Sequence, residues 1–138
     1  TLSSSSAASD VYKRQVCDDE QYFSDKVSDD ICEAQGMWSA LACENIQINT
    51  NDAHVGPGYG RATEPVYERI AALASLEGII LDPVYTGKAF HGLCDELAQG
   101  AFPEATDIIF VHTGGIYGIF PHGQQLAAAA SHPAPWVN

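Results

Sequence analysis

The sequence predicts an α/β fold of three layers (αβα), in which helices cover both faces of an open, mostly parallel sheet. Two apolar runs of strand length carry this prediction, residues 79–81 and 108–111, because continuous apolar segments are typical of strands buried between helices. Each run is followed by a turn rich in Gly or Pro, and segments with helical periodicity lie between the runs. Such an alternation of helix and strand is typical of parallel sheets joined by crossover helices.

Composition narrows the class of protein. The 138 residues are 46% hydrophobic and 17% charged, which predicts one packed domain or a piece of one. The formal net charge of -12 argues against nucleic acid and against anionic membrane surfaces as partners. No apolar run approaches the roughly 18–20 residues that a membrane-spanning helix needs.

The cysteines are widely spaced and form no C-x-x-C pair, so we expect free thiols in a reducing, cytoplasmic compartment. They are Cys17, Cys32, Cys43 and Cys94. His91 and Cys94 share one helix face, but two ligands alone favour packing over a metal ion, so no metal site is predicted.

The first fifteen residues do not resemble natural coding sequence. Residues 5–15 read S-S-A-A-S-D-V-Y-K-R-Q, which resembles the in-frame translation of a sequencing adapter used in transposon tagging. We therefore expect residues 1–15 to be a disordered, non-native segment; a natural flexible N-terminus is the alternative. Residues 16–138 would be the C-terminal part of a longer protein, with residues 127–138 a poorly ordered tail.

Further elements are expected along the chain. Residues 16–17 would end a strand, residues 19–38 would form a helix with an acidic solvated face, and residues 46–49 alternate as a short strand. Thr63 is expected to cap a helix that runs to about Ser75. Thr86 is expected to cap a helix over residues 87–99, and residues 116–126 would hold one short helix.

Three loops carry the candidate functional residues. Residues 50–61 form a loop in which three glycines and a proline surround Tyr59; a plain surface turn and a Tyr presented over a ligand fit this pattern equally well. Tyr85 lies in the turn after the first apolar run, and Thr113 follows the second. Because the carboxyl ends of parallel strands meet at one edge, the three loops would converge on one crevice.

Three motifs resemble a known family. They are G-P-G-Y-G (56–60), L-E-G-I-I-L-D-P-V-Y-T-G-K (76–88) and I-I-F-V-H-T-G-G (108–115). In this order they resemble the D-cysteine desulfhydrase and 1-aminocyclopropane-1-carboxylate deaminase family, which are pyridoxal 5'-phosphate enzymes of the tryptophan-synthase-β fold type (fold type II). The resemblance covers about residues 16–126 and implies that the chain is an incomplete, C-terminal part of such an enzyme.

The resemblance implies a role for each motif residue. Thr113 would place its hydroxyl at the pyridine nitrogen of pyridoxal phosphate, and Gly114 and Gly115 would let the backbone pass close to the ring. Tyr59 and Tyr85 would be catalytic residues that position a small amino-acid substrate and move protons. The plain structural interpretation is a Thr and two glycines that end a strand, with two Tyr packed at a loop base.

The resemblance also favours one substrate of the family over another. Deaminase-type members carry Glu directly after the motif Tyr and Leu before the paired glycines, whereas this chain has Thr86 and Thr113. Both residues resemble the desulfhydrase type, which implies α,β-elimination of D-cysteine to pyruvate, sulfide and ammonia, with Thr86 as a specificity residue. A 1-aminocyclopropane-1-carboxylate deaminase, an L-cysteate sulfo-lyase and a non-catalytic α/β ligand-binding domain stay open as alternatives.

The lysine that would bind the cofactor covalently is expected upstream. Lys88 follows the T-G turn at a helix start, where a solvated or charge-paired side chain is the favoured interpretation. Without the true lysine, covalent catalysis of this type cannot run, so we expect the 138-residue chain to be inactive alone. The resemblance implies a homodimer for the complete protein.

Overall fold

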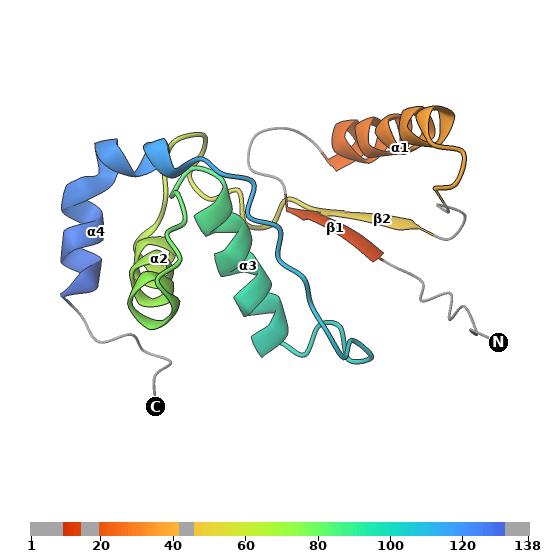
Figure 1. Ribbon diagram of the computed structural model, residues 1–138. Coiled ribbons are helices and arrows are strands. Elements are labelled where there is room, and N and C mark those ends of the chain that lie inside the picture. Colours follow the sequence, from red (N-terminus) through yellow and green to blue (C-terminus); the bar gives the residue numbers. More distant parts are fainter. Residues whose placement is uncertain (1–9, 15–19, 42–45, 132–138) are drawn as a thin grey trace.

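The computed structural model describes residues 10–14, 20–41 and 46–131. Their elements are β1 (Asp10–Arg14), α1 (Glu20–Met37), β2 (Gln47–Asn51), α2 (Glu64–Glu77), α3 (Thr86–Ala98), the 3₁₀ helix η1 (Ile116–His122) and α4 (Gly123–Ala130). In Figure 1 the strands and α1 lie on one side of the molecule, and α2, α3 and α4 lie on the other. None of the described helices is long and apolar enough to span a membrane.

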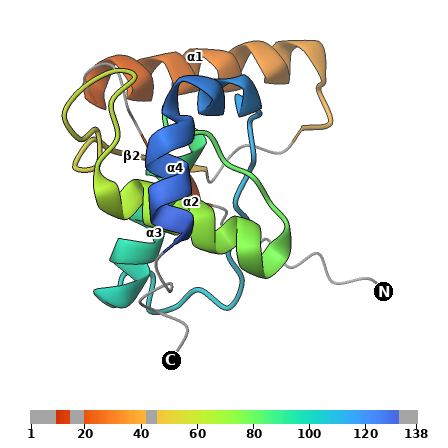
Figure 2. The same cartoon turned by 90° about the vertical axis from the view of Figure 1, so that its left-hand side faces the viewer.

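The core lies where α2 packs against its two neighbours. Figures 1 and 2 show α2 beside both α3 and α4, and both pairs are in contact. Val66 and Ile70 on α2 are buried together with Leu81, which precedes α3. Side chains around them are partly buried: Ala62, Leu73, Phe90, Phe110 and Leu126. The core therefore holds Leu81 against α2, directly before the turn that carries Tyr85.

The sheet differs from the expectation for the N-terminal segment. β1 and β2 form a two-stranded parallel sheet with Asp10 opposite Gln47, and α1 packs on β2. The expectation of disorder over residues 1–15 is thus wrong for Asp10–Arg14, because Val11 and Tyr12 favour strand geometry and an edge strand offers unpaired backbone groups. The strand expected at residues 46–49 is present as β2, and residues 16–17 lie outside the described part of the chain.

The two apolar runs are not strands in the described residues. Residues 79–81 and 108–111 have no regular secondary structure and no ladder partners, and Ile109 and Val111 are 88% and 71% exposed. A strand is defined by hydrogen bonds to a neighbour, so a run of strand-forming residues without one stays irregular. Leu81 nevertheless has the burial that was expected of it, at 1% exposure.

The C-terminal region is more ordered than the sequence indicates. One short helix was expected over residues 116–126, but the structure contains η1 followed by α4. Residues 127–130, expected to begin a poorly ordered tail, complete α4, and Ala129 is buried. A run of alanines has no amphipathic pattern, yet Ala is the strongest helix former, which accounts for the extension. Residues 132–138 lie outside the described residues.

Candidate active site

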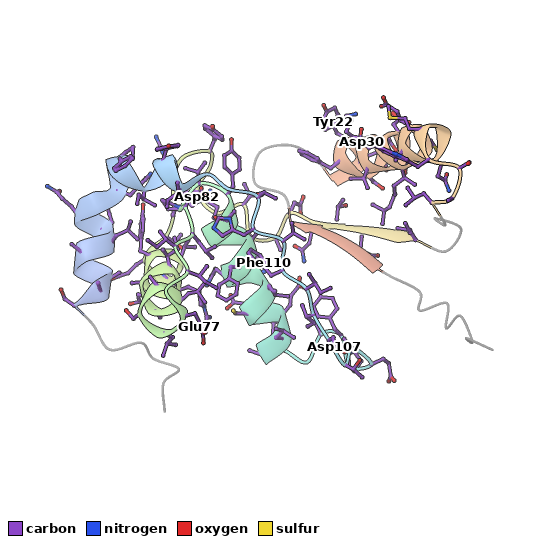
Figure 3. The ribbon with its side chains drawn as sticks, in the orientation of Figure 1. Tyr22, Asp30, Glu77, Asp82, Asp107 and Phe110 are labelled. Carbon is purple, nitrogen blue, oxygen red and sulfur yellow. The ribbon has the colours of Figure 1, made fainter. Side chains whose placement is uncertain are left out.

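The turn between residues 82 and 86 is built around one buried carboxylate. Asp82 is 1% exposed, and its Oδ1 accepts hydrogen bonds from the backbone N–H groups of Val84 (2.8 Å) and Tyr85 (2.7 Å). Its Oδ2 accepts from the backbone N–H of Thr86 at 3.0 Å. Figure 3 shows Asp82 near the beginning of α3. An acceptor with negative charge satisfies N–H groups that have no partner within the helix and interacts favourably with the helix dipole.

Thr86 has a different role from the one expected. It is the first residue of α3, not its cap, and its side chain is 3% exposed. Its hydroxyl donates to Asp82 Oδ2 (2.5 Å) and accepts from the backbone N–H of Asp82 (3.0 Å). The prediction that Thr86 caps this helix is wrong, because its hydroxyl is engaged with Asp82 and its own backbone N–H is one of the groups that the carboxylate accepts. Thr86 holds the turn that carries Tyr85 and has almost no exposed surface of its own.

Tyr59 and Tyr85 form a hydrogen-bonded pair at the surface. The Tyr85 hydroxyl donates to the Tyr59 hydroxyl at 2.9 Å, and the rings meet edge to face with centroids 5.8 Å apart. Tyr59 is 66% exposed and Tyr85 is 41% exposed. Two linked hydroxyls that face solvent can orient a polar ligand and can pass a proton along the pair.

Lys88 is buried, which corrects the expectation of a solvated or charge-paired side chain. It is 1% exposed, and its Nζ donates to the carbonyl oxygens of Val55 (2.8 Å) and Gly58 (2.9 Å). Burial lowers the pKa of Lys88 below its ordinary value, and the negative charge of Asp82 offsets part of that effect. Lys88 thus fixes the glycine-rich loop on both sides of Pro57, directly before Tyr59.

A histidine joins the second turn to the first apolar run. His112 Nε2 lies 3.0 Å from the carbonyl oxygen of Ile80, and His112 Nδ1 accepts from the backbone N–H of Gly114 at 3.0 Å. Because Nδ1 is an acceptor here, Nε2 carries the hydrogen and donates to Ile80. The imidazole therefore holds the segment with Thr113 beside the segment that leads to Tyr85.

Glycine allows this second turn to lie against Asp82. A β carbon at Gly115 would stand 2.8 Å from Asp82 Oδ2, whereas one at Gly114 would meet nothing within 4 Å. Both glycines have positive φ angles, 95° at Gly114 and 87° at Gly115. Thr113, directly before them, is exposed. The structure thus brings the turns that contain Tyr85 and Thr113 together around one carboxylate.

These residues fit one end of pyridoxal phosphate. Thr113 offers an exposed hydroxyl, which suits a neutral pyridine nitrogen as a hydrogen-bond donor, and the open space over Gly114 leaves room for a flat ring. The tyrosine hydroxyls add polar groups on the exposed side of the neighbouring turn. Thr113, Gly114 and the two tyrosines carry no positive charge, which a phosphate group favours, and Lys88 is buried against two carbonyl oxygens, so the phosphate end would need other groups.

Sequence patterns identified the tyrosines, Thr113 and the glycines, but not Asp82 or His112. A signal for Asp82 was available: an Asp four residues before a helix start is well spaced to accept from the first N–H groups. No local signal identifies the contact between His112 and Ile80, because the two residues lie 32 positions apart.

No family model matches the chain, but the chain is similar to known proteins in both sequence and structure. A Pyrococcus furiosus protein whose assigned name is that of a 1-aminocyclopropane-1-carboxylate deaminase is 40% identical over 98 residues, which is 71% of this chain. A solved structure described as an ACC deaminase homologue is 33% identical, covers 86% of this chain and superimposes with a TM-score of 0.68. That likeness confirms the α/β class.

The match covers only part of each relative. It spans 29% of the Pyrococcus protein and 35% of the solved chain, which is about a third of the length of each. The described fold and site therefore correspond to a portion of each relative.

Proposed function

Since the chain belongs to the family of 1-aminocyclopropane-1-carboxylate deaminase and D-cysteine desulfhydrase, we propose that it is part of a D-cysteine desulfhydrase that depends on pyridoxal phosphate. The complete protein would eliminate sulfide and ammonia from D-cysteine and leave pyruvate. The observation that carries the proposal is the hydrogen-bonded pair of Tyr59 and Tyr85 beside a turn that presents Thr113.

When bound, pyridoxal phosphate would supply the electron sink that makes the α proton of an amino acid removable. The Thr113 hydroxyl would donate to the pyridine nitrogen and leave it largely neutral, which suits loss of a good leaving group such as sulfide. Tyr85 and Tyr59 would hold the substrate over the ring. The hydroxyl of Tyr59, which accepts from Tyr85, keeps its own hydrogen for donation to a leaving group.

The Thr86 environment supports the desulfhydrase over the deaminase. The resemblance implies that deaminase-type members have Glu at the position of Thr86. A carboxylate there would lie beside the buried carboxylate of Asp82, and the two negative charges would repel each other strongly. A threonine hydroxyl complements Asp82 instead, since it both donates to and accepts from that residue. Thr86 would influence specificity by shaping the turn that orients Tyr85.

The rest of the fold would come from the other part of the molecule. Residues 79–81 and 108–111 would become central strands of a parallel sheet once neighbouring strands pair with them, which accounts for the exposed apolar side chains of Ile109 and Val111. The lysine that binds the cofactor and the phosphate-binding loop would come from there too. The 138-residue chain alone would then show no turnover.

The test uses the complete protein, recovered with its upstream coding sequence and loaded with pyridoxal phosphate. D-cysteine, 1-aminocyclopropane-1-carboxylate and L-cysteate are assayed in parallel. Sulfide and pyruvate from D-cysteine would support the proposal. Ammonia and 2-oxobutanoate from the cyclopropane would replace it with a deaminase, and sulfite from L-cysteate with a sulfo-lyase. No turnover and no bound cofactor would favour a non-catalytic ligand-binding domain.

The same preparation tests the assembly. We propose a homodimer for the complete protein, on the resemblance alone, and sedimentation equilibrium measures it directly. A mass of one chain at micromolar concentration would contradict the dimer without affecting the proposed chemistry.

A further inference from the structure

Three potential metal ligands lie close together where the loop that carries Tyr59 meets α3. His54 belongs to that loop, while His91 and Asp95 lie one helical turn apart on α3. One ligand atom from each residue lies within 4.8 Å of the other two. Sequence patterns had paired His91 only with Cys94, and the partners that the fold supplies are different ones.

The distances suit a common ion. His91 Nε2 and Asp95 Oδ2 are 3.4 Å apart, and two ligands that bind one zinc ion at roughly 2.0–2.1 Å with tetrahedral angles are about 3.3 Å apart. The rings of His54 and His91 are 6.0 Å apart and nearly perpendicular, at 86°. A nitrogen of His54 thus lies within 4.8 Å of the ligand atoms of His91 and Asp95.

The second oxygen of the carboxylate is held separately. Arg69 on α2 contacts Asp95 Oδ1 at 3.3 Å, on the oxygen that does not face His91. Such an outer contact orients a ligating carboxylate and leaves Oδ2 available. The plain alternative is an ion pair between protonated His91 and Asp95, as is common at this helical spacing, and it gives His54 no role.

The space around the group admits a further ligand. A pocket of about 190 Å³ is lined by His54, His91 and Lys88 together with Ala53, Gly56, Pro57, Thr63 and Val66. A volume of this size holds water molecules beside the two imidazoles. Three protein ligands and one water form a common coordination set for zinc.

We propose that His54, His91 and Asp95 form a binding site for Zn²⁺ or a similar transition-metal ion. Two imidazole nitrogens with one carboxylate oxygen suit such ions, whereas Ca²⁺ and Mg²⁺ favour oxygen ligands throughout. A bound ion would join the loop to α3 at a point separate from the two carbonyls that Lys88 holds. The site does not depend on the lyase proposal.

The test is calorimetric titration of the untagged 138-residue chain with ZnCl₂ after removal of metal by a chelator. We expect one ion per chain, and the substitutions His54→Gln and Asp95→Asn should each weaken binding at least about tenfold. His122→Gln is the matched control, since that imidazole contacts the Tyr67 hydroxyl and belongs to another element. Far-UV circular dichroism of each variant verifies that the fold is retained.

Cobalt distinguishes the ligand type. A Co²⁺ complex of the chain should show visible absorption without the charge-transfer bands of a thiolate, and Cys94→Ser should bind as the parent chain does. Absence of one-to-one binding would overturn the proposal. So would unchanged affinity in His54→Gln, or loss of binding in Cys94→Ser.

Discussion

The backbone of Gly115 lies directly against the carboxylate of Asp82: a β carbon at Gly115 would stand 2.8 Å from Asp82 Oδ2. The same carboxylate accepts the backbone N–H groups at the beginning of α3. One buried charge therefore organises the turn before Tyr85 and also forms the surface on which the turn after Thr113 rests.

This contact predicts different costs at two neighbouring glycines. Gly114→Ala should lower the free energy of unfolding by about 1 kcal/mol, because only the positive φ is unfavourable there. Gly115→Ala should cost about 2 kcal/mol more, since its β carbon also meets Asp82. Urea unfolding of both variants measures the difference. Equal losses would show that the two turns are not in close contact.

A second prediction concerns the carboxylate itself. Asp82→Asn should destabilise the fold by about 2 kcal/mol, because the amide nitrogen would face either the N–H of Thr86 or the N–H groups that Oδ1 now accepts. Asp107→Asn is the matched control, since that residue is exposed and accepts a hydrogen bond from the hydroxyl of its neighbour Thr106. Figure 3 labels both aspartates. Similar unfolding midpoints for the two variants would contradict the role of Asp82.

A third prediction concerns pH and Lys88. Its pKa is lowered in the folded chain, so between that value and 10.5 the unfolded chain binds more protons and stability rises with pH. Wild type should therefore gain stability relative to Lys88→Met as pH rises toward 10.5. Urea unfolding at several pH values from neutral to 10.5 measures this difference.

The control for Lys88 is a lysine whose pKa is shifted in the opposite direction. A hydrogen bond to Asp30 and the negative charge of Asp30 raise the pKa of the exposed Lys26. The stabilising contribution of Lys26 therefore declines as pH rises above the pKa that lysine has in the unfolded chain. Lys26→Met should change the pH profile little and in the opposite sense, since exposed ion pairs contribute weakly. A Lys88→Met profile parallel to that of wild type would mean that Lys88 is not desolvated.

A fourth prediction concerns the tyrosine pair in the complete protein. Tyr85→Phe should lower kcat roughly 10²-fold, because it removes the donor to Tyr59, while the thermal midpoint should hardly change since both rings are exposed. Tyr117→Phe is the control, because Tyr117 is 80% exposed and packs on Phe120. Equal kcat values for the two variants would remove the tyrosine pair from the mechanism.

Local patterns predicted the local structure well. The limits of α1 and α2 followed from periodicity, and the turn at α2's end uses Gly78 in the left-handed conformation. The two apolar runs were predicted as strands and are not strands here, because a strand needs a neighbour that its own residues cannot specify. Thr86 was predicted as a cap, but its hydroxyl and its backbone N–H both bond to Asp82.

The sequence by itself determined α1, α2 and α3, the order of the three motifs and the family to which they belong, since each depends on residues close together in the chain. Only the tertiary structure decided that Lys88 holds the loop of Gly58, 30 positions away, and that His54 meets His91. Those contacts join segments through the packing of α3 against the loop. Which residues meet in such contacts depends on how the whole chain folds, and no local pattern in the sequence specifies it.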